Sequence, residues 1–336
     1  MTVLKCQPSV EILLAAFNAE DYLPRQIESI LNQSYSNFRL IILDDHSTDR
    51  TQDLIALYQA ADSRITFVVP LRPFRQPLRS FEYLLSLSTA EFVFLSDHDD
   101  VWLPEKLSEQ MKLIDQLTNS PGPLLVSSNA YLVSGEVAQS AGYRGYPCFF
   151  SASFVAWFND LTVRDKASYL SHSNLVIGHT IGLNRALIEM SLPFPETVRM
   201  HDWWLATLAA LGGMIFVDKK AMTFYRQHRK NYIGSSRWRR FKAFDFGAFK
   251  FVLTRLLQSL AQFNSALSRV SKSQGLRPSE HGLKSFIMTI PSLSRWQLFV
   301  GFLKFGLFAP VGDLPKLLAQ LLLIFRHKPS RSKRQA

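Results

Sequence analysis

The chain has 336 residues, of which 47% are hydrophobic and 19% are charged, a composition that fits a globular protein and excludes a disordered one. Its net charge of +11 is unevenly distributed, because residues 1–225 carry −7 and residues 226–336 carry +18. This asymmetry predicts two functional regions, and the basic one suggests nucleic acid, a membrane surface or another anionic partner.

The two cysteines, Cys6 and Cys148, exclude a disulfide framework and match no metal-binding spacing, which favours a reducing compartment. The first 18 residues make a poor signal peptide, because Pro8 and Glu11 interrupt the apolar segment and no small-residue cleavage site follows. We therefore expect a cytoplasmic protein.

The first half of the chain alternates apolar runs with segments of helical spacing. Strands are expected at 10–16, 39–45, 65–69 and 91–97, and helices at 20–34, 47–61, 80–88 and 104–117. Ser47, Thr48 and Asp49 can each cap the second helix, and Pro104 suits the first turn of the fourth. Such alternation predicts an α/β fold, with a mostly parallel sheet covered by helices on both faces.

Beyond residue 117 the pattern is weaker. Strands are expected at 123–133 and 214–218, with a helix over 201–213 that ends at Gly212 or Gly213. The aromatic stretch 142–159 gives no clear assignment. A helical stripe of apolar residues then runs from Phe249 to Val270.

Residues 295–328 are strongly apolar but are interrupted by Lys304, Pro310, Asp313, Pro315 and Lys316. Neither half reaches the about 20 residues that cross a bilayer. Two interpretations stay open for the basic region: helices packed on the first domain, or an interfacial membrane anchor in which cationic and apolar residues alternate.

Polar residues follow three of the expected strands, at 15–18, 44–49 and 96–100. One such cluster alone is more often a helix cap or a solvated turn. Three clusters at the carboxyl ends of parallel strands are expected to line one crevice, because ligands of such sheets bind there. There, Asp45 could accept a hydrogen bond from a pyrimidine ring N–H. Asp97 and Asp99 repel each other, and a Mg²⁺ shared with a diphosphate would explain their pairing. These residues predict a nucleotide-diphosphate site.

The segment from Val10 to Thr51 resembles the nucleotide-binding start of inverting glycosyltransferases of family two, which have the GT-A fold. "SDHDDVW" (96–102) is similar to the D-x-D region of a bacterial subgroup that includes rhamnosyltransferases, with His98 where glutamine is usual. "GHTIGLNR" (178–185), "HDWW" (201–204) and "YRQHRKN" (225–231) continue the match, with Arg229 where glycine is commoner. The resemblance covers roughly residues 8–235.

The resemblance implies a catalytic domain over residues 1–235 and a basic, apolar helical extension over 236–336. It also implies a role for each matching position. The nucleotide would be bound by Asp45, Phe17 and Asn18. Mg²⁺ or Mn²⁺ and the diphosphate would be held by Asp97 and Asp99, with His228 as a further metal ligand and with Arg226 and Asn231 at the phosphates. The acceptor side would contain Gly178, His179 and Trp203, and the general base would be Asp202.

The implied reaction transfers a sugar, rhamnose being one option, from a uridine- or thymidine-diphosphate donor with inversion. The acceptor would be a hydroxyl of a glycan or lipid-linked glycan held at the inner face of the cytoplasmic membrane, for cell-surface polysaccharide such as O-antigen. The metal would offset charge on the leaving diphosphate. No nucleic acid is expected as a partner.

Ordinary structural roles compete with these assignments. Asp202 could cap its helix, Arg185 could start one, and His179, His228 and Trp203 could be core residues.

Two other functions compete as well. One is a haloacid-dehalogenase-like phosphatase with Asp97 as nucleophile, although the second acidic cluster that this mechanism needs is missing from the sequence. The other is a non-enzymatic protein whose basic tail binds nucleic acid.

Overall fold

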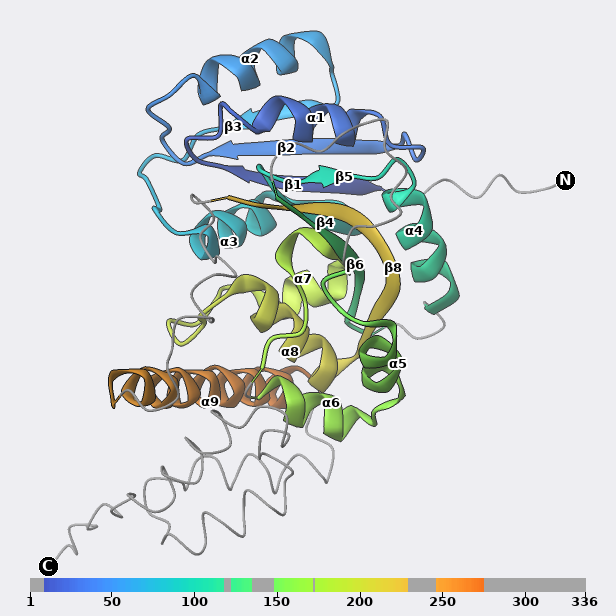
Figure 1. Cartoon of the computed structure of the whole chain (residues 1–336), viewed down its shortest axis with the longest axis vertical. Coiled ribbons are helices and arrows are strands. Elements are labelled where there is room, and N and C mark those ends of the chain that lie inside the picture. Colours follow the sequence, from blue (N-terminus) through green and yellow to red (C-terminus); the bar gives the residue numbers. More distant parts are fainter. Residues whose placement is uncertain (1–8, 118–121, 135–147, 172, 229–245, 275–336) are drawn as a thin grey trace, which may run out of the picture.

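The computed structural model describes residues 9–117, 122–134, 148–171, 173–228 and 246–274. Eight strands form one sheet there: β1 (Val10–Ala16), β2 (Phe38–Asp44), β3 (Ile65–Val68), β4 (Phe92–Asp97), β5 (Val101–Trp102), β6 (Leu124–Ser134), β7 (Ile181–Asn184) and β8 (Met214–Gln227). The helices are α1 (Leu23–Leu31), α2 (Thr51–Ala61), α3 (Pro77–Leu87), α4 (Lys106–Leu117), α5 (Ala152–Asp160), α6 (Val163–Leu170), α7 (Arg185–Ser191), α8 (His201–Gly212) and α9 (Phe246–Gln274). Figure 1 shows their arrangement.

The sheet has the strand order β3-β2-β1-β4-β7-β6-β8-β5. β1 pairs in parallel with β2 and β4, β2 with β3, and β6 with β8, whereas β7 and β5 run antiparallel to their neighbours. The expected mostly parallel sheet is confirmed. Because β7 is antiparallel to both β4 and β6, the carboxyl ends of β1, β2, β4 and β8 lie on the same side of the sheet.

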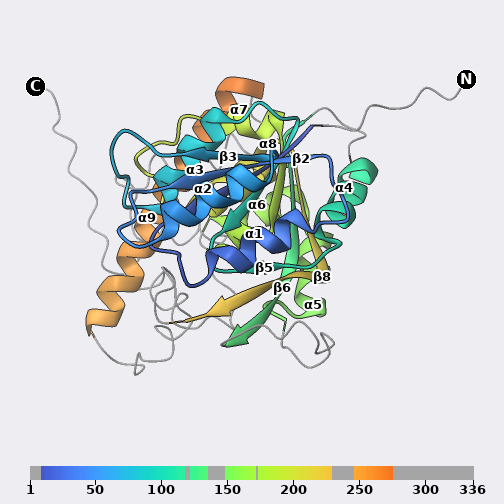
Figure 2. The same cartoon turned by 90° about the horizontal axis from the view of Figure 1, so that it is seen from above.

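Helices cover both faces of the sheet, as expected. On β1, Ile12 and Leu14 belong to an apolar cluster with α1, α2 and α4, while Leu13 belongs to a second cluster with α3 and α5–α9. Figure 2 shows α1 and α2 over the first face. The strands are apolar on both sides because both sides are buried, which is why they read as continuous hydrophobic runs.

Helix α8 lies inside the second layer, where all twelve of its residues are buried. A helix enclosed on every side needs apolar residues all round, which this one has. It ends at Gly212, one of the two expected ends, and Gly213 is its C-cap. A Cβ on Gly213 would lie 1.9 Å from the carbonyl oxygen of Pro123, so only glycine fits where the chain turns into β8.

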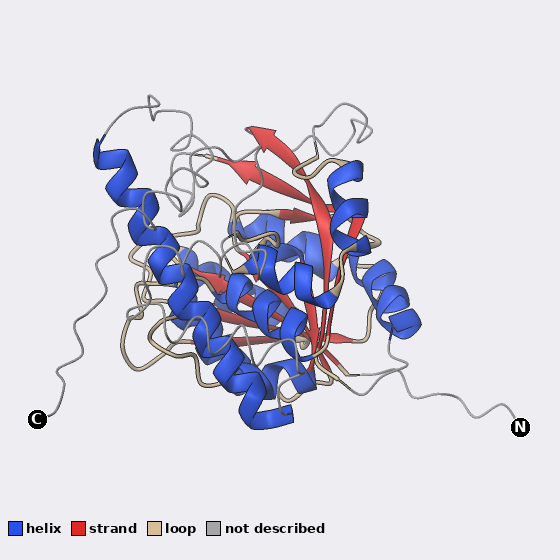
Figure 3. Cartoon of the chain, turned by 90° about the horizontal axis from the view of Figure 1, so that it is seen from below, coloured by secondary structure: helices blue, strands red, loops and turns tan. Residues whose placement is uncertain are grey.

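Helix α9 packs against α8 and α7 and confirms the predicted stripe in the part of the helix whose side chains the structure describes. Leu260, Phe263, Leu267 and Val270 are buried there. Figure 3, viewed from below, shows this helix running across the molecule. The first helix of the basic extension is therefore part of the core of the first domain.

The proposed boundary at residue 235 and the apolar stretch 295–328 lie outside the described residues. None of the helices in the described part of the chain combines the length and the apolarity that crossing a membrane requires.

Some expected element boundaries were wrong. β8 continues to Gln227, well past the expected end at 218, because it pairs with β6 along most of its length. Helix α4 begins at Lys106, so Pro104 precedes its first turn. The N-cap of α2 is Arg50, and its side chain caps no backbone group.

Of the three residues expected to cap α2, Asp49 binds an N–H at the start of the helix, whereas Ser47 and Thr48 bond to Asn18 after β1. Asp49 accepts the N–H of Thr51 at 3.0 Å, and the Ser47 hydroxyl accepts the N–H of Asn18 at 2.8 Å. Arg185 is the first residue of α7, so the structural interpretation of that residue is confirmed.

Candidate active site

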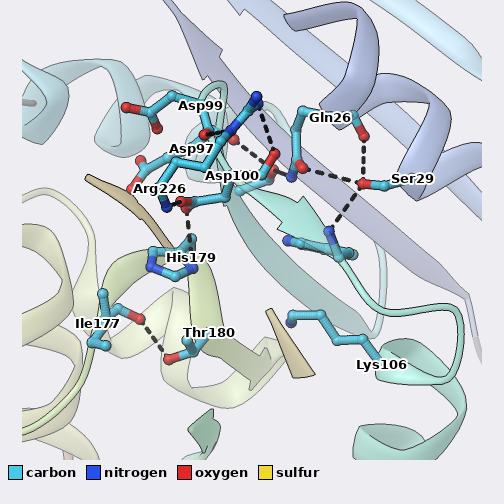
Figure 4. A network of polar contacts seen from close by, with 12 residues as sticks. Gln26, Ser29, Asp97, Asp99, Asp100, Lys106, Ile177, His179, Thr180 and Arg226 are labelled. Atoms are coloured by element: carbon cyan, nitrogen blue, oxygen red, sulfur yellow. Dashed lines mark hydrogen bonds and ion pairs between the residues drawn. The ribbon is translucent and has the colours of Figure 1, made fainter. Parts of the chain in front are cut away.

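Three carboxylates meet where β4 ends. Asp97 is the last residue of the strand, and Asp97, Asp99 and Asp100 each place an oxygen so that the three atoms lie within 4.8 Å of one another. Asp97 is half-buried, whereas Asp99 is 8% exposed and Asp100 is fully buried. Figure 4 shows the three side chains gathered beside Arg226.

Burial and mutual repulsion shape the charge of this cluster. Burial, followed by the nearby charges of Asp99 and Asp202, raises the pKa of Asp97 to about 8. Burial likewise raises the pKa of Asp100 well above its usual value. Carboxylates this close cannot all ionise easily unless a cation joins them.

His228 and Tyr22 form the wall of the cluster on the β8 side. The His228 ring places Nε2 2.9 Å from Oδ2 of Asp99, and it stacks on Tyr22 with the ring centroids 4.4 Å apart. His228 follows β8, which ends on the same side of the sheet as β4. The sequence gives no signal for the contribution of Tyr22.

The Arg226 guanidinium is directed at backbone carbonyls. Its Nε donates to the carbonyl of Asp99 at 2.5 Å, and an Nη donates to the carbonyls of Asp100 and Tyr22 at 3.2 Å each. The guanidinium carbon lies 4.8 Å from the centre of the Tyr22 ring. Arg226 is 5% exposed, and these contacts join the loop after β4 to the segment before α1.

His179 lies beneath the cluster, next to Asp100 (Figure 4). Nδ1 of His179 is 3.1 Å from Oδ2 of Asp100, and neither side chain is exposed. Burial lowers the pKa of His179 to about 3, so its imidazole is neutral at physiological pH. Asp100 was expected among the polar residues at 96–100, but no role in holding a cation was predicted for it.

Asp202 lies in the first turn of α8 and is 7% exposed. Its Oδ1 accepts the N–H of Trp203 at 2.7 Å, and the N-cap is Met200, so Asp202 is not the capping residue. Burial raises the pKa of Asp202 to about 6, against the opposing effect of hydrogen bonds that include the side chain of Asn174 and the backbone of Gly178. The sequence did not predict Asn174 as a site residue, because it belongs to none of the motifs that indicate the site.

Asp202 is also close enough to Asp97 for its charge to affect the pKa of that residue. The structure therefore brings the candidate base and the carboxylate cluster together.

Gly178 and Trp203 lie beside Asp202. A Cβ on Gly178 would come within 2.7 Å of Nε2 of His201, so the close approach of the two chain segments needs glycine there. Trp203 is 7% exposed and donates its indole N–H to the carbonyl of Leu170 at 2.7 Å.

The residues expected at the nucleobase lie at the ends of β1 and β2. Phe17 is 48% exposed. Asn18, with a left-handed φ of 47°, accepts the N–H of Thr48 at 2.9 Å and so joins the two strand ends. Asp45 is buried, and its two oxygens accept the N–H groups of Phe74 and Arg75 at 2.6 Å each. Asn231 lies outside the described residues.

The family model of glycosyl transferase family 2 matches residues 11–188, more than half of the chain. The chain belongs to this family. It is similar to the dTDP-rhamnosyl transferase RfbG of Shigella flexneri, at 24% identity over 231 residues, which cover 66% of this chain and 74% of RfbG.

The chain also resembles WfaP of Escherichia coli, a UDP-Glc:alpha-D-GlcNAc-diphosphoundecaprenol beta-1,3-glucosyltransferase. The two are 32% identical over 106 residues, which cover 32% of this chain and 41% of WfaP. The chain spans about two fifths of the length of the curated relatives that it matches at 32% identity.

Among solved structures, the chain is similar to the mannosyltransferase PcManGT of Pyrobaculum calidifontis in complex with GDP-Man and Mn²⁺. The TM-score is 0.50 at 15% identity, covering 96% of this chain and 89% of PcManGT. This likeness concerns the fold, and with the family match it confirms the expected GT-A fold. The phosphatase interpretation is not retained for a member of this family.

Proposed function

We propose that the protein is an inverting glycosyltransferase that moves a sugar from a uridine- or thymidine-diphosphate donor to a hydroxyl of a lipid-linked glycan, in the synthesis of a cell-surface polysaccharide. The observation that carries this proposal is the meeting of the carboxylates of Asp97 and Asp99 with the buried carboxylate of Asp202. The names of RfbG and WfaP support a pyrimidine nucleotide donor, and that of WfaP supports a lipid-linked acceptor.

A divalent cation fits the cluster, because hard ions such as Mg²⁺ and Mn²⁺ prefer oxygen ligands and share them with phosphates. Asp97 and Asp99 would hold it, with His228, just after β8, as a further donor, and PcManGT binds Mn²⁺ in a similar fold. When bound, the ion would offset charge on the departing diphosphate. Asp100 would support the site from below, since its oxygens face His179 and the N–H of Arg226.

Asp202 is proposed as the general base. A carboxylate with a pKa of about 6 is mostly ionised at neutral pH and still accepts a proton readily from a hydroxyl in the transition state. Its burial excludes competing water, and the N–H of Trp203 fixes its orientation. Attack by the activated hydroxyl on the face opposite the diphosphate would invert the anomeric carbon.

The residues at the nucleotide end are proposed to bind the base. Asp45 has lone pairs left after accepting two N–H groups, and it would accept the ring N–H of uracil or thymine. Phe17 is exposed and could cover the base, whereas Asn18 would act by holding the two strand ends together. Gly178 and Trp203 would form the acceptor side, and Asn231 would contact phosphate.

The test is a thermal-shift panel of UDP, dTDP, GDP and ADP, each with and without Mn²⁺ or Mg²⁺. A pyrimidine diphosphate at about 100 times its Kd should stabilise the protein by about 2.7 kcal/mol, and only when metal is present. Asp99→Ala should abolish this shift, whereas the exposed control Asp165→Ala should keep it.

If nucleotide and metal stabilised Asp99→Ala and wild type equally, the assignment of Asp99 as a metal ligand would be wrong. A shift with GDP alone would show that the nucleotide was wrong. Inversion is read from the anomeric configuration of the first product by NMR.

A further inference from the structure

In the described part of the aromatic stretch that the sequence left unassigned, four rings join two rings from elsewhere in the chain to form a continuous row. Six side chains make up this row, which we call the aromatic strip: Phe149, Phe150, Phe154, Trp157, Tyr169 and Tyr225. Phe149 lies 6.1 Å from Tyr225 and 4.7 Å from Phe150, measured between ring centroids. From Phe150 the row passes to Phe154 at 5.5 Å, and Phe154 lies 5.6 Å from Trp157 and 6.2 Å from Tyr169.

The strip is open to solvent. Phe149 is 42% exposed and Trp157 is 45% exposed, and the other four side chains are partly exposed. Helix α5 meets the core through Val155 and Phe158, which are buried, and through the partly buried Phe154. Trp157 is not part of this core packing. Contiguous exposed apolar surface of this kind marks an interaction site.

Both ends of the strip are connected to the candidate active site through a buried residue, His179 at one end and Leu170 at the other. At one end the Tyr225 ring lies 4.9 Å from that of His179, which is next to Asp100. At the other end Tyr169 precedes Leu170, whose carbonyl accepts the indole N–H of Trp203 beside Asp202. Figure 1 shows α5 and α6 together, below β8. The strip therefore follows the acceptor side rather than the nucleotide end.

The charge around the strip argues against an anionic membrane as its occupant. Residues 148–170 contain two acidic and two basic residues and are therefore neutral, whereas membrane-surface segments carry an excess of Lys and Arg. Ser151 and Ser153, which are both exposed, lie in the sequence between Phe150 and Phe154. Exposed aromatic rings with hydroxyl groups nearby suit a carbohydrate chain, because the negative face of a ring attracts the polarised C–H groups of a sugar.

We propose that the aromatic strip binds the non-terminal sugars of the acceptor, so that the enzyme recognises an oligosaccharide chain rather than one terminal sugar. This inference rests on the proposed function and deepens it. Several successive sugars would lie across Trp157, Phe154 and Phe149, and the chain end would reach Asp202. The strip would bind a neutral oligosaccharide. It would distinguish acceptors by the length of their sugar chain rather than by their charge.

The experiment measures binding of linear tetrasaccharides of glucose, rhamnose or N-acetylglucosamine to the full-length protein by saturation-transfer NMR, each against its own monosaccharide. Wild type should bind at least one tetrasaccharide more tightly than the monosaccharide. The double variant Phe149→Ala/Trp157→Ala should weaken that binding about tenfold, the size expected for two lost ring contacts. Trp157→Tyr should retain most of it.

Two controls separate the strip from general damage. Leu57→Ala removes another exposed apolar side chain, 65% exposed and on α2, and should change nothing. The melting temperature of the double variant should match that of wild type, because both truncated side chains are solvent-exposed.

The proposal would be overturned if wild type and the double variant bound the tetrasaccharide equally. It would also be overturned if wild type bound nucleotide with metal but no tetrasaccharide. A third contrary result is that the double variant loses binding to anionic liposomes and not to glycans. Failure of the proposed function itself would be seen separately, as absence of metal-dependent nucleotide binding in the same wild-type sample.

Discussion

Asp202 gives the enzyme a pH dependence that can be predicted from its surroundings. Burial raises its pKa to about 6, and the ionised form is the one that accepts a proton. The transfer rate at saturating donor and metal should therefore fall as pH drops below about 6 and reach a plateau above it. Initial rates between pH 5 and 8 measure this, and a flat profile would contradict the base assignment.

Replacing Asp202 separates its role in catalysis from binding. Asp202→Asn keeps the size of the side chain and an acceptor for the N–H of Trp203 but removes the base, so transfer should fall by about 10²–10⁴-fold. Nucleotide binding in the presence of metal should stay within about twofold of wild type. Loss of both together would instead show that Asp202 is part of the donor site.

Arg226, which is predicted to contact the phosphates, donates to backbone carbonyls around the cluster and lies over the Tyr22 ring. Lysine lacks the planar fork that reaches the carbonyls of Asp99 and Tyr22 together. Arg226→Lys should therefore weaken metal-dependent nucleotide binding and lower the free energy of unfolding by about 1–3 kcal/mol, since buried acceptors lose their donor. Urea denaturation and a nucleotide titration measure the two effects.

The control for Arg226→Lys is Arg39→Lys, whose side chain is 59% exposed and should be neutral. Unchanged nucleotide affinity in Arg226→Lys would show that the loop after β4 holds its shape without this contact.

At the scale of elements, the parallel strands were predictable because burial on both faces makes each strand a continuous apolar run. The length of β8 could not be predicted, because Lys219 and Lys220 interrupt its apolar pattern. Its pairing with β6, which extends the strand, is a tertiary contact that the local sequence does not indicate. The same limit applies to the site. Asp97 and Asp99 are adjacent to an obvious strand, whereas Tyr22 and Asn174 reach the site only through the folding of distant segments.

Helix α9 is expected to unfold together with the catalytic domain. Leu267 has no exposed surface, and Arg269 donates to the carbonyls of Leu192 and Pro193 at 2.7 Å each. Leu267→Ala should lower the free energy of unfolding by about 2–5 kcal/mol, the usual range for a buried leucine. Far-UV circular dichroism and tryptophan fluorescence should report one coincident transition.

The matched control on α9 is Gln258→Ala, on its exposed surface, which should stay within about 0.5 kcal/mol of wild type. Two separate transitions would show instead that α9 is an independent unit.

For the whole molecule, the packing of α9 decides where the basic extension can be cut. Ending the chain after residue 274 keeps α9 and removes ten basic and two acidic residues. We expect this truncated protein to bind nucleotide with metal as wild type does but to lose binding to anionic liposomes, each lost cation contributing about 1 kcal/mol near the surface. Liposome flotation measures this, and retained binding would refute the anchor.

Ending the chain at residue 236 would be a poorer experiment. It would remove α9 and expose the apolar side of α8, so a loss of membrane binding could not be distinguished from misfolding.

The contacts between α9 and α8 also have a geometric consequence. Asp202 is in the first turn of α8, and Arg269 of α9 lies over the ring of Trp204 in the same helix, 5.8 Å from its centre. The last turns of α9 are therefore fixed to the core and to the helix that carries Asp202. A surface that bound the residues beyond 274 would therefore pull on a helix packed against the one that carries Asp202.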